Sequence, residues 1–393
     1  MSEPSTSQAS PTPAGDPVAR LTREQVDDLG RELDALREEV LADLGPADAA
    51  YIRRVVRVAR ASAVVGRTLL MFGVDPVSFV VGTAALSLAK VLDNMEIGHN
   101  VLHGQYDWMN DPSLESRTYE WDIVCPSAQW RHYHNFEHHV FTNVLGKDRD
   151  VGYGLMRVSE TQGWSPFHLL QPLVNLGLCL GFQWGVGMHD LVEEPAEPGP
   201  GLEARLAEKK ALFAAKKWEF RRKAGRQVFK DYVFFPLLAA WNAPRVLLGN
   251  LLANLLRNVW SNVIIFCGHF PDGVRVFTEE EAASESRGQW YVRQMLGSAN
   301  IEGGRLFHLL TGHLSHQIEH HLFPDLPARR YPAIAERVRG LCERYGLAYN
   351  TGSLARQYGS VLARNWRLAF PPRARELVLA VIADGAAGDT TTA

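Results

Sequence analysis

The sequence predicts an all-α integral membrane protein with about four transmembrane helices, arranged as two hairpins beneath a cytosolic helical cap. Three observations support this prediction. Two long apolar regions are each interrupted by proline, a strongly basic segment lies between them, and ten of the fourteen histidines fall into three tight groups. Mean hydropathy is only −0.14 because polar segments separate the apolar ones.

The N-terminal part is expected to lie outside the membrane. Residues 1–17 are rich in Ser, Thr, Pro and Ala, which predicts a disordered tail. Residues 18–56 predict cytosolic amphipathic helices, because apolar residues recur there every three or four positions. The main membrane domain is expected at 57–370, and residues 371–393 predict a C-terminal helix followed by a disordered tail.

The first apolar region covers about residues 57–98 and is broken at Asp75-Pro76. Proline cannot continue a helix through that point, so a hairpin of two spans, about 57–74 and 76–98, is expected. A pair of buried helices in a soluble protein is the alternative. The second apolar region, 232–268, would form a helix of about 55 Å, too long for one hydrocarbon core of about 30 Å. The turn signal Asn242-Ala243-Pro244 divides it into spans at about 232–243 and 245–268.

The segment 205–230 contains ten Lys or Arg and only two acids, Glu208 and Glu219. Short basic segments beside membrane spans stay in the cytoplasm. If the apolar stretch 167–188 crossed the membrane once, this segment would lie on the opposite side. The stretch 167–188 is therefore expected to be an interfacial or cap-packed helix. Residues 99–230 and 269–370 then form the cap, and both termini and the active site lie on the cytoplasmic side of a cell membrane.

Composition excludes several classes of protein. Lys and Arg number 41 against 44 Asp and Glu, so a globally basic nucleic-acid binder is excluded. The four cysteines are widely spaced and form no CxxC motif, which excludes a disulfide scaffold, a zinc ribbon and a ferredoxin-type iron–sulfur pattern.

Histidine spacing predicts a metal centre. The first group is HNVLH, the second is HNFEHH and the third is HQIEHH. Residues four apart lie on one helix face, so each group offers a pair of imidazoles. Two HxxxHH strings and one HxxxH string suit a dinuclear site, whereas a single pair would more simply be a surface histidine pair or a structural zinc site. The histidines of these strings are His99 and His103; His134, His138 and His139; and His316, His320 and His321, while His132 and His313 lie just before the second and third strings.

The metal is inferred from missing motifs. No group has the HExxH pattern of zinc proteases. The soluble carboxylate di-iron bundle needs two ExxH motifs, and Glu96…His99 is the one match. A non-haem iron pair held by histidines is therefore the preferred choice.

Four segments resemble the membrane-bound fatty acid desaturases and hydroxylases, and among them most closely the bacterial acyl-CoA desaturases of the stearoyl-CoA delta-9 kind. They are GHNVLHGQYDWMND (98–111), WRHYHNFEHHVFTNVLGKDRDVGYG (130–154), NVWSNVIIFCGHFPDG (258–273) and HLSHQIEHHLFPDLPARRY (313–331). The resemblance runs from about residue 50 to 370. It implies four membrane helices under a cytosolic cap, two irons and O2 as co-substrate.

The resemblance also implies a ligand set. Many relatives write the third group as HxxHH, in which register Gln317 takes the first position; the i, i+4 relation to His320 favours His316 instead. Catalytic residues other than the metal ligands, and substrate-binding residues, are not identified. The implied metal ligands are His99, His103, His134, His138, His139, His269, His316, His320 and His321. The residues expected to orient them are Glu96, Glu137, His313, Gln317 and Glu319.

The implied activity is oxygen-dependent insertion of a cis double bond into a long-chain acyl-CoA or acyl-lipid. A hydroxylase of the same family would use the same histidines, and a non-redox membrane metal-binding protein is a more remote alternative. The chain has no dinucleotide-binding, iron–sulfur or cytochrome motif, so the electron donor is expected to be a ferredoxin or an NAD(P)H-dependent reductase. The basic segment 205–230 is a candidate contact for coenzyme A phosphates or anionic lipids.

Overall fold

The computed structural model describes residues 21–192 and 199–372. The predicted tail at 1–17 lies outside the described residues, as do the predicted C-terminal helix and tail at 371–393 except for their first two residues. The regular secondary structure of the described chain is helical apart from two short strands, β1 (Asn300–Glu302) and β2 (Thr351–Ser353), which pair in parallel. The all-α prediction is therefore confirmed.

The predicted amphipathic helix at the N-terminus is α1 (Arg23–Ala42). Thr22 caps it by accepting a hydrogen bond from the backbone N–H of Gln25. Its apolar stripe, which includes Leu29 and Leu33, is fully buried against α12 (Arg287–Leu296) and α15 (Tyr331–Tyr345). This helix is therefore an integral part of the cap.

The first hairpin consists of α2 (Pro46–Phe72) and α3 (Pro76–Val91). Helix α3 continues through the π-helical segment η2 (Leu92–His99) into α4 (Asn100–Leu102). Asp75 caps α3 by accepting from the N–H of Ser78 at 2.9 Å. Gly66 lets the two helices touch, since a Cβ there would lie 2.7 Å from the backbone nitrogen of Leu86. Because α2 begins at Pro46, the expected boundary at residue 57 falls inside one continuous helix.

The second hairpin is longer than expected in its first arm. Helix α8 (Leu202–Phe229) runs on through η7 (Lys230–Phe234) and α9 (Phe235–Leu238), and η8 (Ala240–Asn242) leads into α10 (Ala243–His269). The expected span 232–243 therefore falls at the end of the long helical stretch formed by α8, η7 and α9. Within the described ranges, two helical stretches are long and apolar enough to cross a membrane, Pro76–Leu102 and Ala240–His269. The count of four spans and their bounds stay predictions.

The stretch 167–188 is sharply bent. The short helix η6 (Pro166–Leu170) leads into α6 (Gln171–Leu180), and α7 (Phe182–Met188) follows at an angle of 98°. Gly181 lies at the bend. The bend is compatible with the expected interfacial or cap-packed helix, and it makes a single straight crossing impossible.

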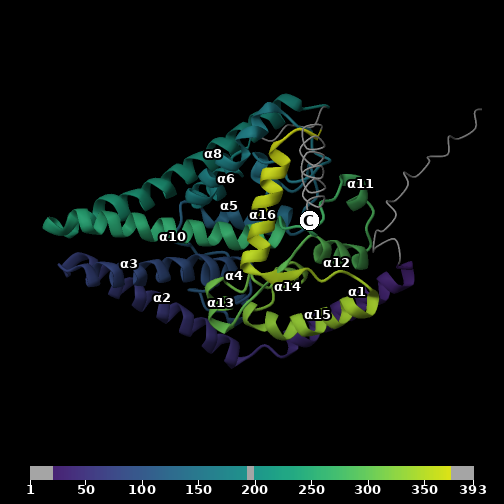
Figure 1. Ribbon diagram of the computed structural model, residues 1–393, viewed down its shortest axis with the longest axis horizontal. Helices are drawn as coiled ribbons and strands as arrows, with labels where there is room; N and C mark the ends of the chain where they lie inside the picture. Colours follow the sequence, from purple (N-terminus) through teal and green to yellow (C-terminus); the bar gives the residue numbers. More distant parts are fainter. Residues whose placement is uncertain (1–20, 193–198, 373–393) are drawn as a thin grey trace, which may run out of the picture.

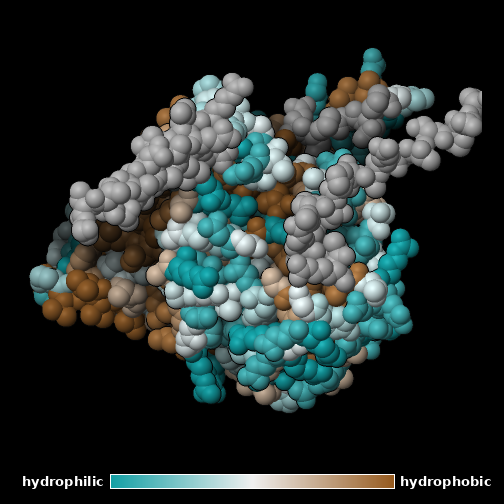
Figure 2. All heavy atoms as spheres, turned by 45° about the vertical axis from the view of Figure 1, so that its right-hand side comes forward, coloured by the Kyte–Doolittle hydropathy of each residue, from teal (hydrophilic) through white to brown (hydrophobic). Residues whose placement is uncertain are grey.

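The two hairpins extend from the cap toward the left of Figure 1. Their tips expose large apolar side chains, and Figure 2 shows hydrophobic residues gathered at this end while the cap is mainly hydrophilic. A soluble surface rarely exposes so many large apolar side chains together, so this end suits a lipid environment. Among the exposed residues, each more than two-thirds accessible, are Phe72, Val74, Val77, Leu237 and Trp241.

The cap is built from shorter helices around two apolar cores. One core joins α1, α12, α14 (Gln317–Leu322) and α15, and the other joins the segment 121–158 to α6, α7, α10 and α16 (Leu354–Ala369). The remaining cap elements are η3 (Asp107–Met109), α5 (Ser127–Tyr133), η4 (His134–His138), η5 (Val151–Gly154), α11 (Glu279–Ala282), α13 (Arg305–Leu310) and η9 (Ala328–Arg330).

Candidate metal centre

Four parts of the chain meet at one buried point, where the hairpins join the cap. The end of η2 and α4 brings the first histidine group, η4 brings the second, α14 brings the third, and the last turn of α10 adds His269. Seven of these imidazoles are buried and His134 is half-buried. The eight residues are His99, His103, His134, His138, His139, His269, His320 and His321.

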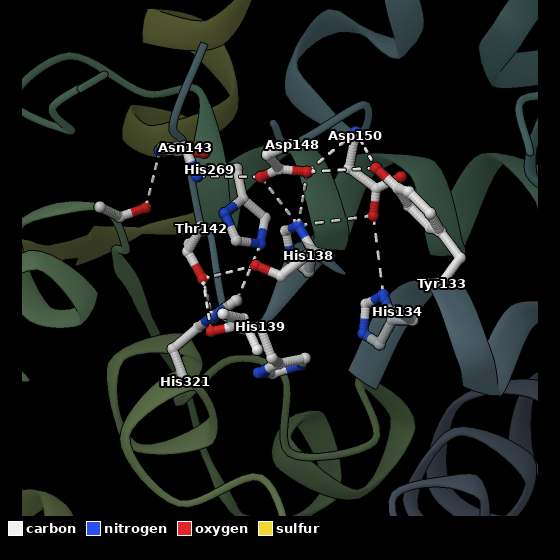
Figure 3. A network of polar contacts seen from close by, with 12 residues as sticks. Tyr133, His134, His138, His139, Thr142, Asn143, Asp148, Asp150, His269 and His321 are labelled. Carbon is white, nitrogen blue, oxygen red and sulfur yellow. Dashed lines mark hydrogen bonds and ion pairs between the residues drawn. The ribbon is translucent and has the colours of Figure 1, made fainter. Parts of the chain in front are cut away.

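The imidazole nitrogens fall into two sets that share no member. His99, His103, His134 and His320 form one set, and His138, His269 and His321 form the other; within each set the ligand atoms lie within 4.8 Å of one another. His139 lies between the sets, in a group with His320 and His321. Figure 3 shows the second set with its neighbours. The arrangement fits two adjacent metal ions, each held mainly by imidazoles.

Several of these nitrogens have no hydrogen-bond partner although they are buried. They include Nε2 of His103, His134 and His320 and both ring nitrogens of His139. Leaving buried polar atoms unpaired is costly. Burial lowers the pKa of His134 to about 3 and lowers the pKa of His139 well below its ordinary value, which keeps both rings neutral. Neutral, unpaired imidazoles that converge on one point are the form in which histidine binds a metal.

Two aspartates contact the Nδ1 atoms of histidines in the second group (Figure 3). Asp148 contacts Nδ1 of His138 with both carboxylate oxygens, at 3.0 and 3.1 Å. Asp150 lies 3.6 Å from Nδ1 of His134 and 2.8 Å from Nε2 of His189. Burial alone would lower the pKa of His138, but Asp148 and Asp150 outweigh it and raise this pKa to about 8. Carboxylates in this position orient metal-binding imidazoles and make them better ligands.

Neutral groups orient three further rings in the same way. The hydroxyl of Thr142 lies 3.1 Å from Nδ1 of His321, and the hydroxyl of Tyr331 lies 3.4 Å from Nδ1 of His320. The side-chain oxygen of Asn100 lies 3.1 Å from Nδ1 of His99. In each case Nδ1 meets an outer partner, so Nε2 is left to face the centre.

The structure does not bring His316 to this cluster, which corrects the expectation from its spacing. Helix α14 begins at Gln317, and His316 before it has φ −106° and ψ 58°, outside the helical region. Its ring therefore packs against His308, with centroids 4.6 Å apart. Gln317 takes the inner place, with its side-chain amide 2.9 Å from Nε2 of His269.

The glutamates expected to orient the ligands also have other partners. The Glu137 carboxylate accepts from Arg149 at 2.8 Å. Glu96 accepts from Tyr51 and lies 2.9 Å from Nδ1 of His313. The two contacts of Glu96 connect α2 and η2 to the segment before α14.

Glu319 accepts from Asn300 and Tyr349, and burial raises the pKa of Glu319 to about 7. Its nearest histidine contact is Nδ1 of His316, at 3.8 Å. Glu96, Glu137, Glu319 and His313 thus make none of their hydrogen bonds to the eight clustered imidazoles.

A cavity lies against the centre. Its walls include His99, His134 and His269, and the middle is lined by apolar side chains. The apolar residues of the middle include Met95, Ile123, Phe182, Val186, Ile265 and Leu314.

Comparison with known proteins identifies relatives among the fatty acid desaturases, in agreement with a histidine-rich metal site. The family model for fatty acid desaturases matches residues 75–353. A Mycobacterium tuberculosis protein, the NADPH-dependent stearoyl-CoA 9-desaturase, is 46% identical over 91% of this chain and 83% of its own length. The sn-1 linoleoyl-lipid 6-desaturase of Synechocystis is 25% identical over 74% of this chain and 80% of its own. Human fatty acid desaturase 3 is 27% identical over 57% and 46%, respectively. The chain therefore belongs to the fatty acid desaturase family, as its histidine motifs predict.

Proposed function

We propose that this protein is a membrane acyl-CoA desaturase that inserts a cis double bond at the ninth carbon of a long saturated acyl chain. The observation that supports this most strongly is the convergence of eight imidazoles beside a cavity with largely apolar walls. Family membership supplies the reaction type, and the name of the mycobacterial relative suggests the acyl carrier and the position of the double bond.

Two non-haem irons are the proposed cofactor. His99, His103, His134 and His320 would hold one ion, and His138, His139, His269 and His321 the other. Bound iron would supply the O2-dependent oxidation of unactivated methylene groups, which acid–base side chains cannot perform. Gln317 lies close enough to His269 for its side-chain oxygen to complete the second set after an amide flip, since the O and N positions of such amides are assigned from the hydrogen-bond network.

The chain itself orients the ligands and holds the substrate. Asp148 and Thr142 fix the rings of His138 and His321, so that their other nitrogens stay directed at the metals. The apolar walls bind the acyl chain with about 0.8 kcal/mol for each buried methylene and keep water out. Trp130 stacks on His134 with ring centroids 4.2 Å apart, which closes the cavity beside the centre.

The proposed topology places the cap, both termini and the active site on the cytoplasmic side of the cell membrane. Two electrons per turnover would then come from a separate cytosolic donor, a ferredoxin or an NAD(P)H-dependent reductase. The relative named as NADPH-dependent supports the second type of donor.

Product analysis tests this function. Cells that express the protein are fed stearate deuterated at the ninth and tenth carbons, and fatty acids are identified by mass spectrometry. Wild type should yield an oleoyl product that has lost two deuterium atoms, His138→Ala and His320→Ala should yield none, and the exposed His132→Ala should retain activity. A product that gains an oxygen atom would show a hydroxylase instead. No product from iron-loaded wild type supplied with a reductase would overturn the proposal.

A further inference from the structure

The cavity beside the metal centre has a cationic far end. Arg257 of α10 is only 1% exposed, and its side chain lines this cavity. Ser261, Ile265 and His269 follow on the same helix at intervals of four residues and line the same cavity. This stripe rises about 18 Å from Arg257 to His269. The cavity therefore runs along α10 from a buried arginine to the imidazole cluster.

Arg257 is not neutralised by a direct ion pair within the part of the chain that the structure describes. Its guanidinium donates to the backbone carbonyl of Asp122 at 3.1 Å and to the side-chain oxygen of Asn258 at 3.1 Å. A guanidinium has five N–H donors. A buried charge with so few partners is costly unless another group pairs with it.

The carboxylates nearby are already engaged. The Asp231 carboxylate lies 2.8 Å from Lys90 and 3.3 Å from Arg67. The Asp122 carboxylate lies 3.3 Å from Lys90 and also pairs with Lys230. Asp93 accepts hydrogen bonds from Tyr119 and from the backbone of Asp122. With Arg257, this network at the base of the hairpins has four cations and three carboxylates, and Arg257 is the cation that reaches the cavity.

The neighbours of Arg257 on the cavity wall are polar, unlike the middle of the cavity. They include Asn94, Gln183 and Asn258. Asn94 donates to the hydroxyl of Ser261 at 3.0 Å. The cavity thus has a hydrogen-bonding cationic end, an apolar middle and a metal-binding end. A methyl terminus would gain nothing at the cationic end, whereas an oxygen acceptor would satisfy it.

We propose that Arg257 binds the carbonyl oxygen of the substrate's thioester or ester and thereby sets which carbons reach the metals. This inference rests on the proposed function. The double bond should then be counted from the carbonyl, whatever the total chain length.

Ligands that lack the carbonyl test this directly on the unmodified protein. An S-octadecyl thioether of coenzyme A should inhibit the purified iron-loaded enzyme about 10- to 100-fold less well than a non-reactive thioester of equal length, because a hydrogen bond to a charged group is lost. Ester- and ether-linked phosphatidylcholines repeat the comparison for a lipid substrate. Equal inhibition by carbonyl and ether ligands in both series would overturn the inference. Discrimination in one series alone identifies the carrier.

Substitutions supply the second test. Arg257→Gln should raise KM by about 10- to 100-fold and give mixed double-bond positions, and Arg257→Lys should restore part of both. Arg67→Gln is the matched control, because Arg67 belongs to the same charge network but does not line the cavity. The inference fails if Arg257→Gln keeps one double-bond position and the wild-type KM, or if Arg67→Gln has the same effect. Absence of product from wild type would instead refute the proposed function.

Discussion

The carboxylate of Asp148 offers the sharpest test of the metal centre, because its substitution by asparagine changes charge with little change in shape. Asp148 is 4% exposed and contacts Nδ1 of His138 with both oxygens. It also accepts from the backbone N–H groups of Asn143 and Asp150, at 2.9 and 3.0 Å. In Asp148→Asn, one oxygen becomes an NH₂ group, which must face either these donors or the N–H of His138.

The expected loss follows from the contacts. Replacing a group that orients a metal-binding histidine lowers metal affinity or activity by about 10- to 100-fold. That corresponds to about 1.4–2.8 kcal/mol. Asp148 supports one ligand of the second set, so the loss should fall on one of the two ions, and the loaded protein should retain about one iron per chain at limiting iron concentration.

Two measurements detect this loss. One is the iron content per chain, determined by mass spectrometry after dialysis against increasing concentrations of an iron chelator, and the other is the turnover rate. Glu137→Gln is the matched control, because it lies beside His138 but pairs with Arg149 at the protein surface. A surface ion pair contributes about 1 kcal/mol or less, so this variant should bind iron normally. If Asp148→Asn retains both irons at every chelator concentration, or if Glu137→Gln loses iron equally, Asp148 does not support a metal ligand.

Three further predictions concern which histidines of the third group bind metal, the charge network between the hairpins, and the pH dependence of stability. His316→Ala should keep both irons and most activity, whereas His320→Ala should lose both properties; an equal loss of iron in the two variants would return His316 to the ligand set. Lys90→Met should destabilise the protein by about 1–3 kcal/mol and lower Tm in detergent, because the buried Asp231 carboxylate loses its nearest donor and keeps only the more distant Arg67 and Lys230. An unchanged Tm would contradict this. Hydrogen bonds from Arg330 hold the pKa of Asp48 below its ordinary value of 3.8, although burial alone would raise it. Asp48 should therefore stabilise the protein at neutral pH, with the contribution lost as pH falls below about 4, and Asp48→Asn should remove that acid-dependent part of Tm.

The sequence predicts those parts of the site that depend on local helical spacing. His99 and His103 lie on one helical face as expected, with ring centroids 4.6 Å apart. The break at Asp75-Pro76 also forms the turn of the first hairpin. Both signals are local, so no knowledge of the tertiary structure is needed to read them.

The two HxxxHH strings have the same histidine spacing but fold differently, and the spacing alone does not show why. In the second group, α5 leads directly into η4, so His134 is already helical. Before the third group the chain turns through His313, which has φ 56°, and the helix starts only at Gln317. Where a helix begins is set by the turn before it, which packs here against η2, and a motif read alone cannot show this.

The sequence places Asp148 among several acids near the histidine groups, but it does not single out Asp148 as an orienting residue. It is ten residues from His138 and reaches it through an irregular loop, in which Asn143 and Gly146 have positive φ. The sequence shows an acid near the second group, but it does not show which acid the loop turns inward. The role of Arg257 is hidden for a similar reason, since an arginine within an apolar stretch reads as an interruption until the cavity beside it is known.

The residues that face the centre differ in charge from those that surround it. The third group supplies two imidazoles, and His269 with the neighbouring Gln317 occupies the remaining place on the second set. With metals bound as proposed, every inner residue would be electrically neutral, while Asp148 and Asp150 would carry their charges one layer further out. A centre with neutral ligands leaves the positive charge of the metals largely uncompensated, which favours electron uptake. The outer carboxylates moderate that charge through His134 and His138 alone, both from the second group. His138 contacts both Asp148 and Asp150, whereas His134 contacts Asp150. If each ring binds one ion as proposed, the ion bound by His138 should therefore be the harder of the two to reduce.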